Sequence, residues 1–245
     1  EKDIDQLVER GDIRVIKKPV SKRFEIAGIL KALEPIPVLF QTVKESEFRV
    51  AGNLFCTKAQ IADYFGIGVP DLISTLSRAI EKHSPPQMVT DAPCQEVVRS
   101  NVNLDEIPIL THNAVDGGPY VSSAVVVTSD PEYGQNLDFH RAMQLDKVRM
   151  STRIVSGRDF HKFLQRTGEL DVAYCVGNTP EILVAAATSV ETGVDELEIA
   201  NALRPIRVTK AKTVDLRIPA DCEFVLEGRV FLKEKHDEGP FSDLT

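Results

Sequence analysis

The sequence lacks the short motifs that mark three common kinds of site. No GxGxxG, GxxxxGKS/T or GxSxG segment occurs in its 245 residues. These motifs supply a dinucleotide fingerprint, a P-loop and a nucleophile elbow, respectively. Their absence argues against all three.

Cysteine is scarce, and its spacing argues against a structural metal site. The four cysteines, Cys56, Cys94, Cys175 and Cys222, are far apart and form no CxxC pair, so no zinc site is expected. They fit a reducing cytoplasm, in which each thiol packs as a small apolar group. We therefore expect a cytoplasmic protein.

Long apolar runs and an excess of positive charge are also absent. No segment is apolar for long enough to span a membrane, and no signal-peptide pattern opens the chain. Lys and Arg total 29 and Asp and Glu total 37, so the net charge is −8. Because an acidic protein has no general attraction to nucleic acid or anionic lipid, we expect neither partner.

The composition that remains is typical of a soluble globular protein, with 42% apolar and 27% charged residues. Residues 1–95 alternate short helical and strand patterns, which predicts a small α/β domain. A Pro-rich stretch at 83–97 marks the expected boundary. Residues 96–245 are strand-rich, with helical patterns at 179–190 and 195–204, and predict a barrel-like second domain. The expected fold class is α+β.

Arg141 stands out among the candidate functional residues. Strand alternation would place it on the more apolar face of its segment, beside Leu137 and Phe139. A buried arginine needs a carboxylate or an anionic ligand. An arginine that snorkels to the sheet edge is the alternative, and the residues alone leave both open.

A second basic group follows in the sequence. Arg149, Arg153 and Arg158 lie within a short span and could grip a phosphate or a carboxylate. A solvated strand face is the plainer explanation. Four histidines stand singly and are expected to be surface or structural residues: His83, His112, His161 and His236.

Acidic residues form two candidate positions. Glu196 opens a helical pattern behind Asp195, where the helix macrodipole alone favours acids. Glu238 and Asp243 flank a Gly-Pro-Phe-Ser turn. Two nearby carboxylates can divide roles, one ionised and one protonated, if their environments differ. An acidic surface turn has the same spacing, so this alternative also stays open.

Taken together and in order, these stretches resemble the UbiD-type decarboxylases, which use prenylated FMN. The resemblance runs from about Asn103 to the last residue, and the amino-terminal βα character fits as well. It is carried by residues 117–147, 179–204 and 213–230, and by "EGPFSD" at 238–243. The resemblance implies an FMN-binding split barrel at 96–245.

The resemblance also implies roles for individual residues. The catalytic residues would be Arg141, Glu238 and Asp243, with Glu238 pairing with Arg141 and Asp243 handling the proton. Asn136 and Glu196 would hold a divalent metal, usually Mn²⁺, at the cofactor phosphate, with K⁺ as a further ion. The flavin-lining residues would be Phe139, His140, Arg141, Arg153, Ile154, Val155 and Arg158.

The sequence departs from the family at two positions. Asp159 stands where some members have a histidine as a further metal ligand, so Asp159 or water would fill that place. Ser242 stands where many members have Gly. Members also continue past the turn into a carboxy-terminal domain, so the resemblance implies that this chain is part of a longer protein.

The implied reaction is the removal of CO₂ from an α,β-unsaturated acid. Trans-anhydromevalonate 5-phosphate is the specific hypothesis, because the compact amino-terminal domain and the arginine- and histidine-rich flavin segment resemble archaeal members that decarboxylate it. His140 would also suit a polar or phosphorylated substrate. A 4-hydroxybenzoate-type aromatic acid is the main rival. The implied partners are a small carboxylic acid, a flavin prenyltransferase that supplies the cofactor, and further copies of the full-length protein. A noncatalytic FMN-binding split-barrel protein and an assembly scaffold are the alternatives from other classes.

Overall fold

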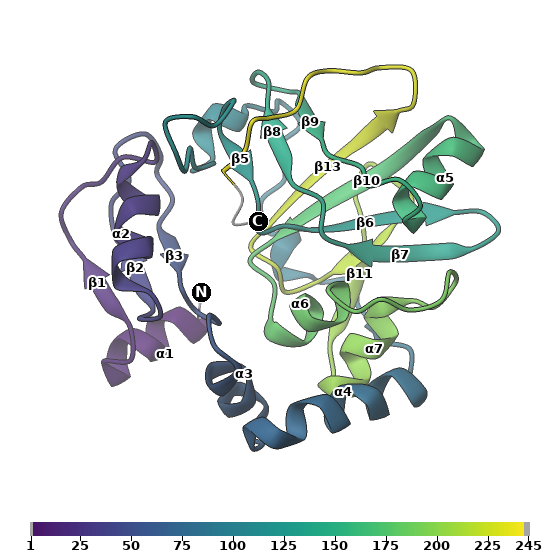
Figure 1. Cartoon of the computed structure of the whole chain (residues 1–245), viewed down its shortest axis with the longest axis horizontal. Coiled ribbons are helices and arrows are strands. Elements are labelled where there is room, and N and C mark those ends of the chain that lie inside the picture. The colour runs from purple at the N-terminus through teal and green to yellow at the C-terminus, as the bar shows by residue number, and fades with distance from the viewer. Residues whose placement is uncertain (1, 243–245) are drawn as a thin grey trace.

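The computed structural model describes residues 2–242, with side chains from residue 4 onward. A small amino-terminal unit lies beside a larger unit built mainly of sheets (Figure 1). The predicted α+β class is confirmed. No helix within residues 2–242 is long and apolar enough to cross a membrane.

The amino-terminal unit is a three-stranded sheet with flanking helices. Its elements are α1 Lys2–Arg10, β1 Arg14–Ile16, α2 Glu25–Leu33, β2 Val38–Phe40, β3 Val50–Gly52 and α3 Lys58–Phe65. β2 lies between β1, which is parallel to it, and β3, which is antiparallel. Gly11 follows α1 with a φ of 75°, as expected for a glycine that ends a helix. Thr57 and Gln60 form a capping box at the start of α3.

A four-stranded antiparallel sheet forms the centre of the larger unit. Its strands, in spatial order, are β13 Phe224–Phe231, β10 Glu169–Val176, β6 Val125–Asp130 and β7 Gly134–Asp138. Val125 and Val127 join the core on one face, whereas Val126 joins the core on the other. The sheet is buried on both faces, and this explains why β6 begins with three successive valines instead of an alternating pattern.

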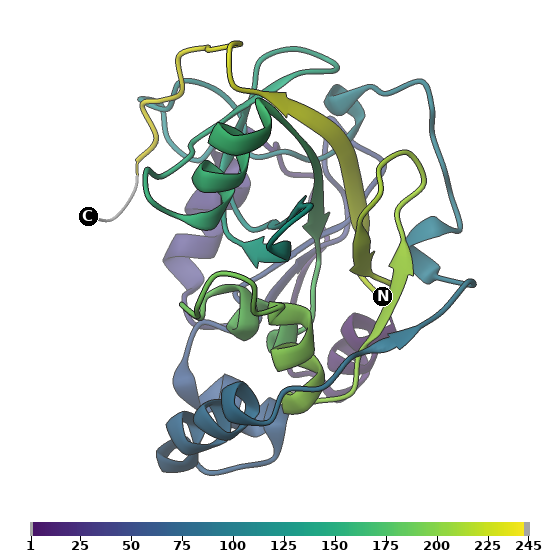
Figure 2. The same cartoon turned by 90° about the vertical axis from the view of Figure 1, so that its right-hand side faces the viewer.

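Different elements cover the two faces of this sheet (Figure 2). The first face is covered by α4 Leu72–Glu81, α6 Pro180–Ala186, α7 Glu196–Leu203 and the small sheet of β12 Arg217–Pro219, β11 Arg207–Lys210 and β4 Gln87–Met88. The second face is covered by α5 Asp159–Thr167 and the small sheet of β5 Tyr120–Val121, β8 Ala142–Gln144 and β9 Met150–Thr152. Three short 3₁₀ helices connect elements: Val69–Asp71, Pro93–Gln95 and Leu104–Glu106.

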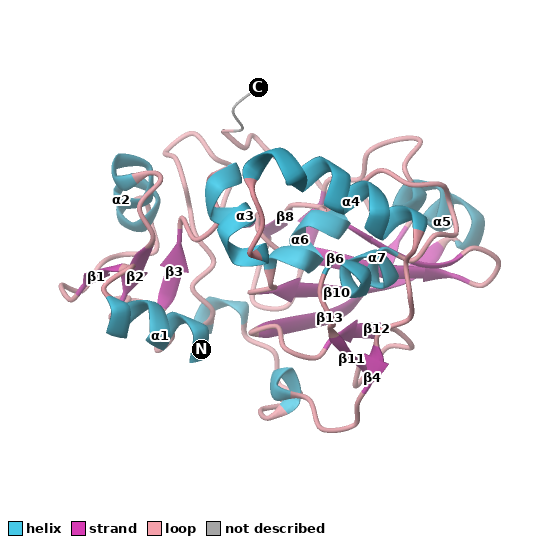
Figure 3. Ribbon diagram, turned by 90° about the horizontal axis from the view of Figure 1, so that it is seen from below, coloured by secondary structure: helices cyan, strands magenta, loops and turns pink. Residues whose placement is uncertain are grey.

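Part of the segment assigned to the amino-terminal domain packs in the core of the larger unit. Figure 3 shows α4 lying across the helical layer that contains α6 and α7. Ala79 of α4 belongs to the core of the first face, and β4 pairs in parallel with β11. The boundary at residue 95 stays a prediction, but residues 72–88 contribute to both the connection and the larger core.

Two features of the strand-rich region differ from expectation. The alternation that placed Arg141 beside Leu137 and Phe139 requires one continuous strand, but β7 ends at Asp138 and β8 begins at Ala142. Residues 139–141, which lie between β7 and β8, therefore belong to neither strand. The helix α5 was not expected, although Phe160, Phe163 and Leu164 have helical spacing and are buried.

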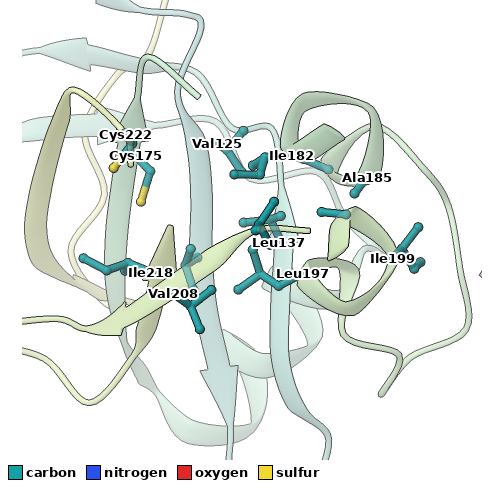
Figure 4. Packing of buried hydrophobic residues seen from close by; sticks show 14 of the residues in the cluster. Val125, Leu137, Cys175, Ile182, Ala185, Leu197, Ile199, Val208, Ile218 and Cys222 are labelled. Carbon is teal, nitrogen blue, oxygen red and sulfur yellow. The ribbon is translucent and has the colours of Figure 1, made fainter. Parts of the chain in front are cut away.

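Three of the four thiols come together in the core of the first face. Cys175 and Cys222 are buried there with adjacent side chains (Figure 4). Cys94 is partly buried and packs against the same core. The expectation that thiols pack as small apolar groups is confirmed for these three. It is wrong for Cys56, which is exposed, because its position just before α3 faces away from the core.

Asp130 fixes the turn between β6 and β7. Its side chain is fully buried, and it accepts hydrogen bonds from Glu132 N (2.8 Å) and Tyr133 N (3.1 Å) and from Arg166 Nε (3.1 Å). Burial opposes ionisation, but these three donors hold the pKa of Asp130 below its ordinary value. The stabilisation is therefore present above the unfolded pKa of an aspartate and is lost as the pH falls through the lower, folded pKa.

We predict that Asp130→Asn lowers the free energy of unfolding by about 1–3 kcal/mol, because a buried charge-assisted network loses its charge and one of its two acceptor oxygens. Urea denaturation at neutral pH measures this change. The matched control is Glu132→Gln, which removes an exposed partner of the same Arg166 and is expected to cost less than about 1 kcal/mol. Equal losses of unfolding free energy in Asp130→Asn and Glu132→Gln would contradict the conclusion that Asp130 stabilises this turn.

Candidate active site

Arg141 and Glu238 form a mostly buried ion pair at the centre of the candidate site. Arg141 Nε donates to Glu238 Oε1 at 2.9 Å, and Arg141 Nη2 donates to Oε2 at 3.2 Å. The two side chains are only 17% and 10% exposed. The structure therefore supports the first explanation for Arg141, a buried arginine with a carboxylate partner. That partner, Glu238, lies in a turn 97 residues later in the chain.

Aromatic rings surround this pair. The Arg141 guanidinium carbon lies 4.9 Å from the centre of the Phe241 ring and 6.0 Å from that of Tyr120. The rings of Tyr120 and Phe241 are 4.4 Å apart, and His112 meets Phe241 edge-on at 5.4 Å. Burial, together with the neighbouring Glu238 carboxylate, raises the pKa of Tyr120 to about 12. A cation held between aromatic faces is stabilised electrostatically.

Tyr120, His112 and Phe241 were not among the residues predicted for the site. Phe241 lies inside the turn that carries Glu238, so its position in "EGPFSD" was an available signal. Tyr120 and His112 also line a broad cleft between the two units. Nothing in the local sequence distinguishes them from ordinary core or surface residues.

His140 ties two loops together beneath the ion pair. Its ring is 2% exposed, with Nδ1 2.9 Å from Arg153 O and Nε2 2.8 Å from Asp138 Oδ2. Because a carbonyl oxygen only accepts, Nδ1 carries a hydrogen. Arg153 N in turn donates to Arg141 O at 3.2 Å. Both ring nitrogens are engaged by protein atoms, so this geometry gives no support to a direct contact between His140 and a polar substrate.

The other predicted flavin-lining residues lie around these loops. Phe139 and Val155 are 42% and 47% exposed, and Ile154 packs partly against the core of the second face. Arg153 and Arg158 have exposed side chains, whereas Arg149 is paired with Asp146 at 2.8 Å. The basic cluster is therefore divided, and Arg153 and Arg158 remain the candidates for anion binding.

Asn136 and Glu196, the predicted metal ligands, are both buried and come together. Glu196 Oε2 accepts from Leu137 N, the residue next to Asn136, at 2.9 Å. Burial, reinforced by the Asp195 and Asp138 carboxylates, raises the pKa of Glu196 to about 8. Glu196 is therefore not one of the solvated acids that a helix start merely tolerates. Asp195 is the N-cap of α7, since it accepts from Leu197 N, but it is mostly buried and pairs with Arg217.

Unsatisfied polar atoms surround this pair. Asn136 Nδ2, Asp138 Oδ1 and Thr128 Oγ1 are buried without a hydrogen-bond partner, and Thr128 lies opposite Asn136 in the strand register. An amide oxygen and a carboxylate suit a hard divalent cation, and half a turn of the Asn136 amide would exchange its Nδ2 for that oxygen. The donor set thus fits a metal in part. Within residues 2–242 no three His, Cys, Asp or Glu side chains form a metal-binding group, so other donors would have to complete it.

Two further predicted positions have simple outcomes. Asp159 Oδ1 accepts hydrogen bonds from Lys162 Nζ and Thr192 Oγ1, each at 2.8 Å, and its role as a third metal ligand stays a prediction. Asp243 lies outside the described residues.

Comparisons with known proteins agree with this arrangement. A family model described as the 3-octaprenyl-4-hydroxybenzoate carboxy-lyase Rift-related domain matches residues 87–245, and one described as the N-terminal domain matches residues 4–80. Anhydromevalonate phosphate decarboxylase of Methanosarcina mazei is 36% identical over 248 residues, which cover 99% of this chain and 57% of that relative. The enzyme of the same name from Methanothermobacter thermautotrophicus is 33% identical, with 94% and 55% covered.

Solved structures with the same fold include two other enzymes. HmfF of Pelotomaculum thermopropionicum in complex with FMN superposes with a TM-score of 0.93 at 32% identity, covering 98% of this chain and 56% of that one. Closed vanillic acid decarboxylase of Sedimentibacter hydroxybenzoicus gives 0.89 at 29% identity, covering 97% and 56%. The chain spans about half the length of the curated relatives it matches.

We predict strong energetic coupling between Arg141 and Glu238. Removing either partner leaves a buried charge unpaired, at a cost of about 3–5 kcal/mol in sites of this kind. The double variant Arg141→Met/Glu238→Leu removes both charges and should be more stable than the sum of the single losses predicts. Urea denaturation of the four proteins in the double-mutant cycle measures the coupling energy.

The control cycle uses the exposed pair Arg229 and Asp171, with Arg229→Met and Asp171→Leu. Its coupling should stay below about 1 kcal/mol. If the losses in unfolding free energy of Arg141→Met and Glu238→Leu simply add in the double variant, the two charges do not stabilise each other. That result would contradict the prediction.

Proposed function

Because the chain belongs to the UbiD family, we propose that the protein removes CO₂ from an unsaturated carboxylic acid with the help of a prenylated flavin. The similar HmfF is described in complex with prFMN and with FMN. The observation that carries the proposal is the bidentate Arg141–Glu238 pair beneath the Phe241 ring. A plain flavin-binding barrel has no need for this arrangement.

The reaction needs an electron sink. Loss of CO₂ from an sp² carbon leaves an electron pair that neither the substrate nor a protein side chain can stabilise. The prenylated flavin, when bound, supplies that sink. The protein's own task is then to orient the carboxylate, exclude water and deliver a proton.

Arg141 is proposed to bind the substrate carboxylate. Glu238 fixes the plane of its guanidinium through two hydrogen bonds, and Tyr120 and Phe241 keep bulk water from the pair. A preoriented guanidinium in a water-poor site binds a carboxylate more strongly than it would in water. Asp243, which follows Glu238 by five residues in the sequence, is proposed as the proton donor to the carbon that has lost CO₂.

The remaining predicted residues are proposed to hold the cofactor. Asn136 and Glu196 would supply an amide and a carboxylate to hold Mn²⁺, whose charge would offset that of the flavin phosphate. The exposed Arg153 and Arg158 supply further positive charge. The exposed Phe139 and Val155 side chains suit an apolar ring surface. The cofactor would come from a flavin prenyltransferase.

Trans-anhydromevalonate 5-phosphate is the proposed substrate. Three curated relatives at 32–36% identity carry the name anhydromevalonate phosphate decarboxylase. An aromatic acid is the second candidate, favoured by the similarity to vanillic acid decarboxylase. The proposal for the substrate rests on the relatives, since His140 does not contribute to it.

The full-length protein, co-expressed with a flavin prenyltransferase, tests the function. We expect the released cofactor to have the mass of prenylated FMN, and CO₂ to be released from anhydromevalonate phosphate. Asp243→Asn should keep the cofactor and lower turnover by about 10²–10⁴-fold, the contribution of a positioned proton donor. Plain FMN in the purified protein, or full turnover by Asp243→Asn, would overturn the respective part of the proposal.

The metal role is tested separately, by the binding of FMN to the full-length protein. Mn²⁺ should tighten FMN binding in the parent, and Glu196→Gln should weaken that effect by at least about tenfold, a loss seen even for outer partners of metal ligands. Glu198→Gln is the matched control on the same helix, because Glu198 pairs with the exposed His83 instead. An unchanged Mn²⁺ effect in Glu196→Gln would rule out a metal at this place.

A further inference from the structure

The turn that carries Glu238 is attached to the rest of the protein by an unexpected loop. After β13 the chain runs past β9 and β8 towards β5 (Figure 1), and residues 233–237 on the way are exposed. Their approach therefore does little to fix the turn. Besides the Arg141–Glu238 pair and the hydrogen bond from Ser151 Oγ to Asp237 O, the contacts that fix the turn come from residues 112–120, just before and at the start of β5.

Asp116 is the centre of this attachment. Its Oδ1 accepts from Ser242 N at 2.8 Å, and its Oδ2 accepts from Asn113 N at 2.8 Å. One carboxylate thus joins its own loop to the far end of the turn. Burial opposes ionisation of Asp116, but these two backbone donors hold its pKa below the ordinary value.

Gly117, the next residue, brings the two backbones into direct contact. Its N–H donates to Pro240 O at 2.7 Å. A Cβ on Gly117 would lie 2.4 Å from Gly239 O, closer than real Cβ atoms approach a backbone oxygen. Gly239 itself has a φ of 115°, which other residues rarely adopt. Both glycines are therefore required by the contact between loop and turn.

The consequence reaches the ion pair. Ser242 and Pro240, which the loop binds, lie on either side of Phe241 in sequence, and Phe241 packs on Tyr120 and over Arg141. Glu238 is two residues before Pro240. Without the hydrogen bond from Ser242 N to Asp116, the turn would keep its contact with Gly117 but would no longer be held at Ser242. The positions of Phe241 and Glu238 would then be less restricted.

We infer that Asp116 is a positioning residue, which anchors the turn at Ser242 so that Glu238 stays on Arg141. The expected effect of Asp116 on catalysis rests on the proposed function, whereas its anchoring of the turn does not. Asp116 contacts neither Arg141 nor Glu238 in the hydrogen bonds of the site and acts through the turn. It also fixes the backbone immediately before Asp243.

The experiment measures hydrogen exchange by mass spectrometry on the full-length protein, in peptides that cover residues 238–242. Asp116→Ala should speed exchange there by roughly tenfold or more, the effect of losing one hydrogen bond to a charged group. Asp116→Asn should give an intermediate rate, because its amide oxygen can still accept from Ser242 N. Peptides from β10 should exchange at the parent rate in both variants.

The matched control is Asp63→Ala, which removes an exposed carboxylate from α3. Unchanged exchange at 238–242 in Asp116→Ala, or equal acceleration in Asp63→Ala, overturns the inference. In decarboxylation assays, Asp116→Ala should lower kcat more than it changes KM, and faster exchange with parental kcat also overturns the positioning role. If the parent releases no CO₂, the proposed function fails, while the exchange data still decide whether Asp116 anchors the turn.

Discussion

The site depends on a guanidinium that is mostly removed from water and must therefore have a carboxylate beside it. Arg141 obtains that carboxylate from Glu238, far along the chain, and the pair fixes where the final turn must lie. Once the turn is there, Phe241 covers Arg141 and packs on Tyr120. The loop at Asp116 and Gly117 then meets the turn. One electrostatic requirement thus sets the positions of three separate segments.

The central sheet makes this arrangement possible because both of its faces are buried. β6 and β7 carry Leu137 to one core and Asn136 to the other side, so a short strand links the apolar core to the polar pair of Asn136 and Glu196. The end of β7 at Asp138 releases residues 139–141 from the sheet. His140 then ties this loop to Arg153, which keeps Arg141 at the edge of the sheet and beside the turn.

Buried polar groups divide into two kinds in this structure. Asp130 has a full set of donors and serves the β6–β7 turn. Glu196 and Asn136, in contrast, are buried beside unsatisfied atoms. Because an unsatisfied buried polar group is costly, the second kind indicates a binding site more than a structural device. The same contrast separates Arg149, which is paired with Asp146, from Arg153 and Arg158.

The sequence by itself determined the class of fold and the helix capped by Asp195, and its resemblance to the family implied the pairing of Arg141 with Glu238. These follow from local capping, strand composition and ordered motifs, which are properties of short segments. Only the tertiary structure decided that His140 is engaged by Asp138 and Arg153, that three distant thiols share one core, and that Asp116 holds the final turn. Each of these depends on contacts between segments far apart in the chain, and local sequence carries no signal for which segments meet.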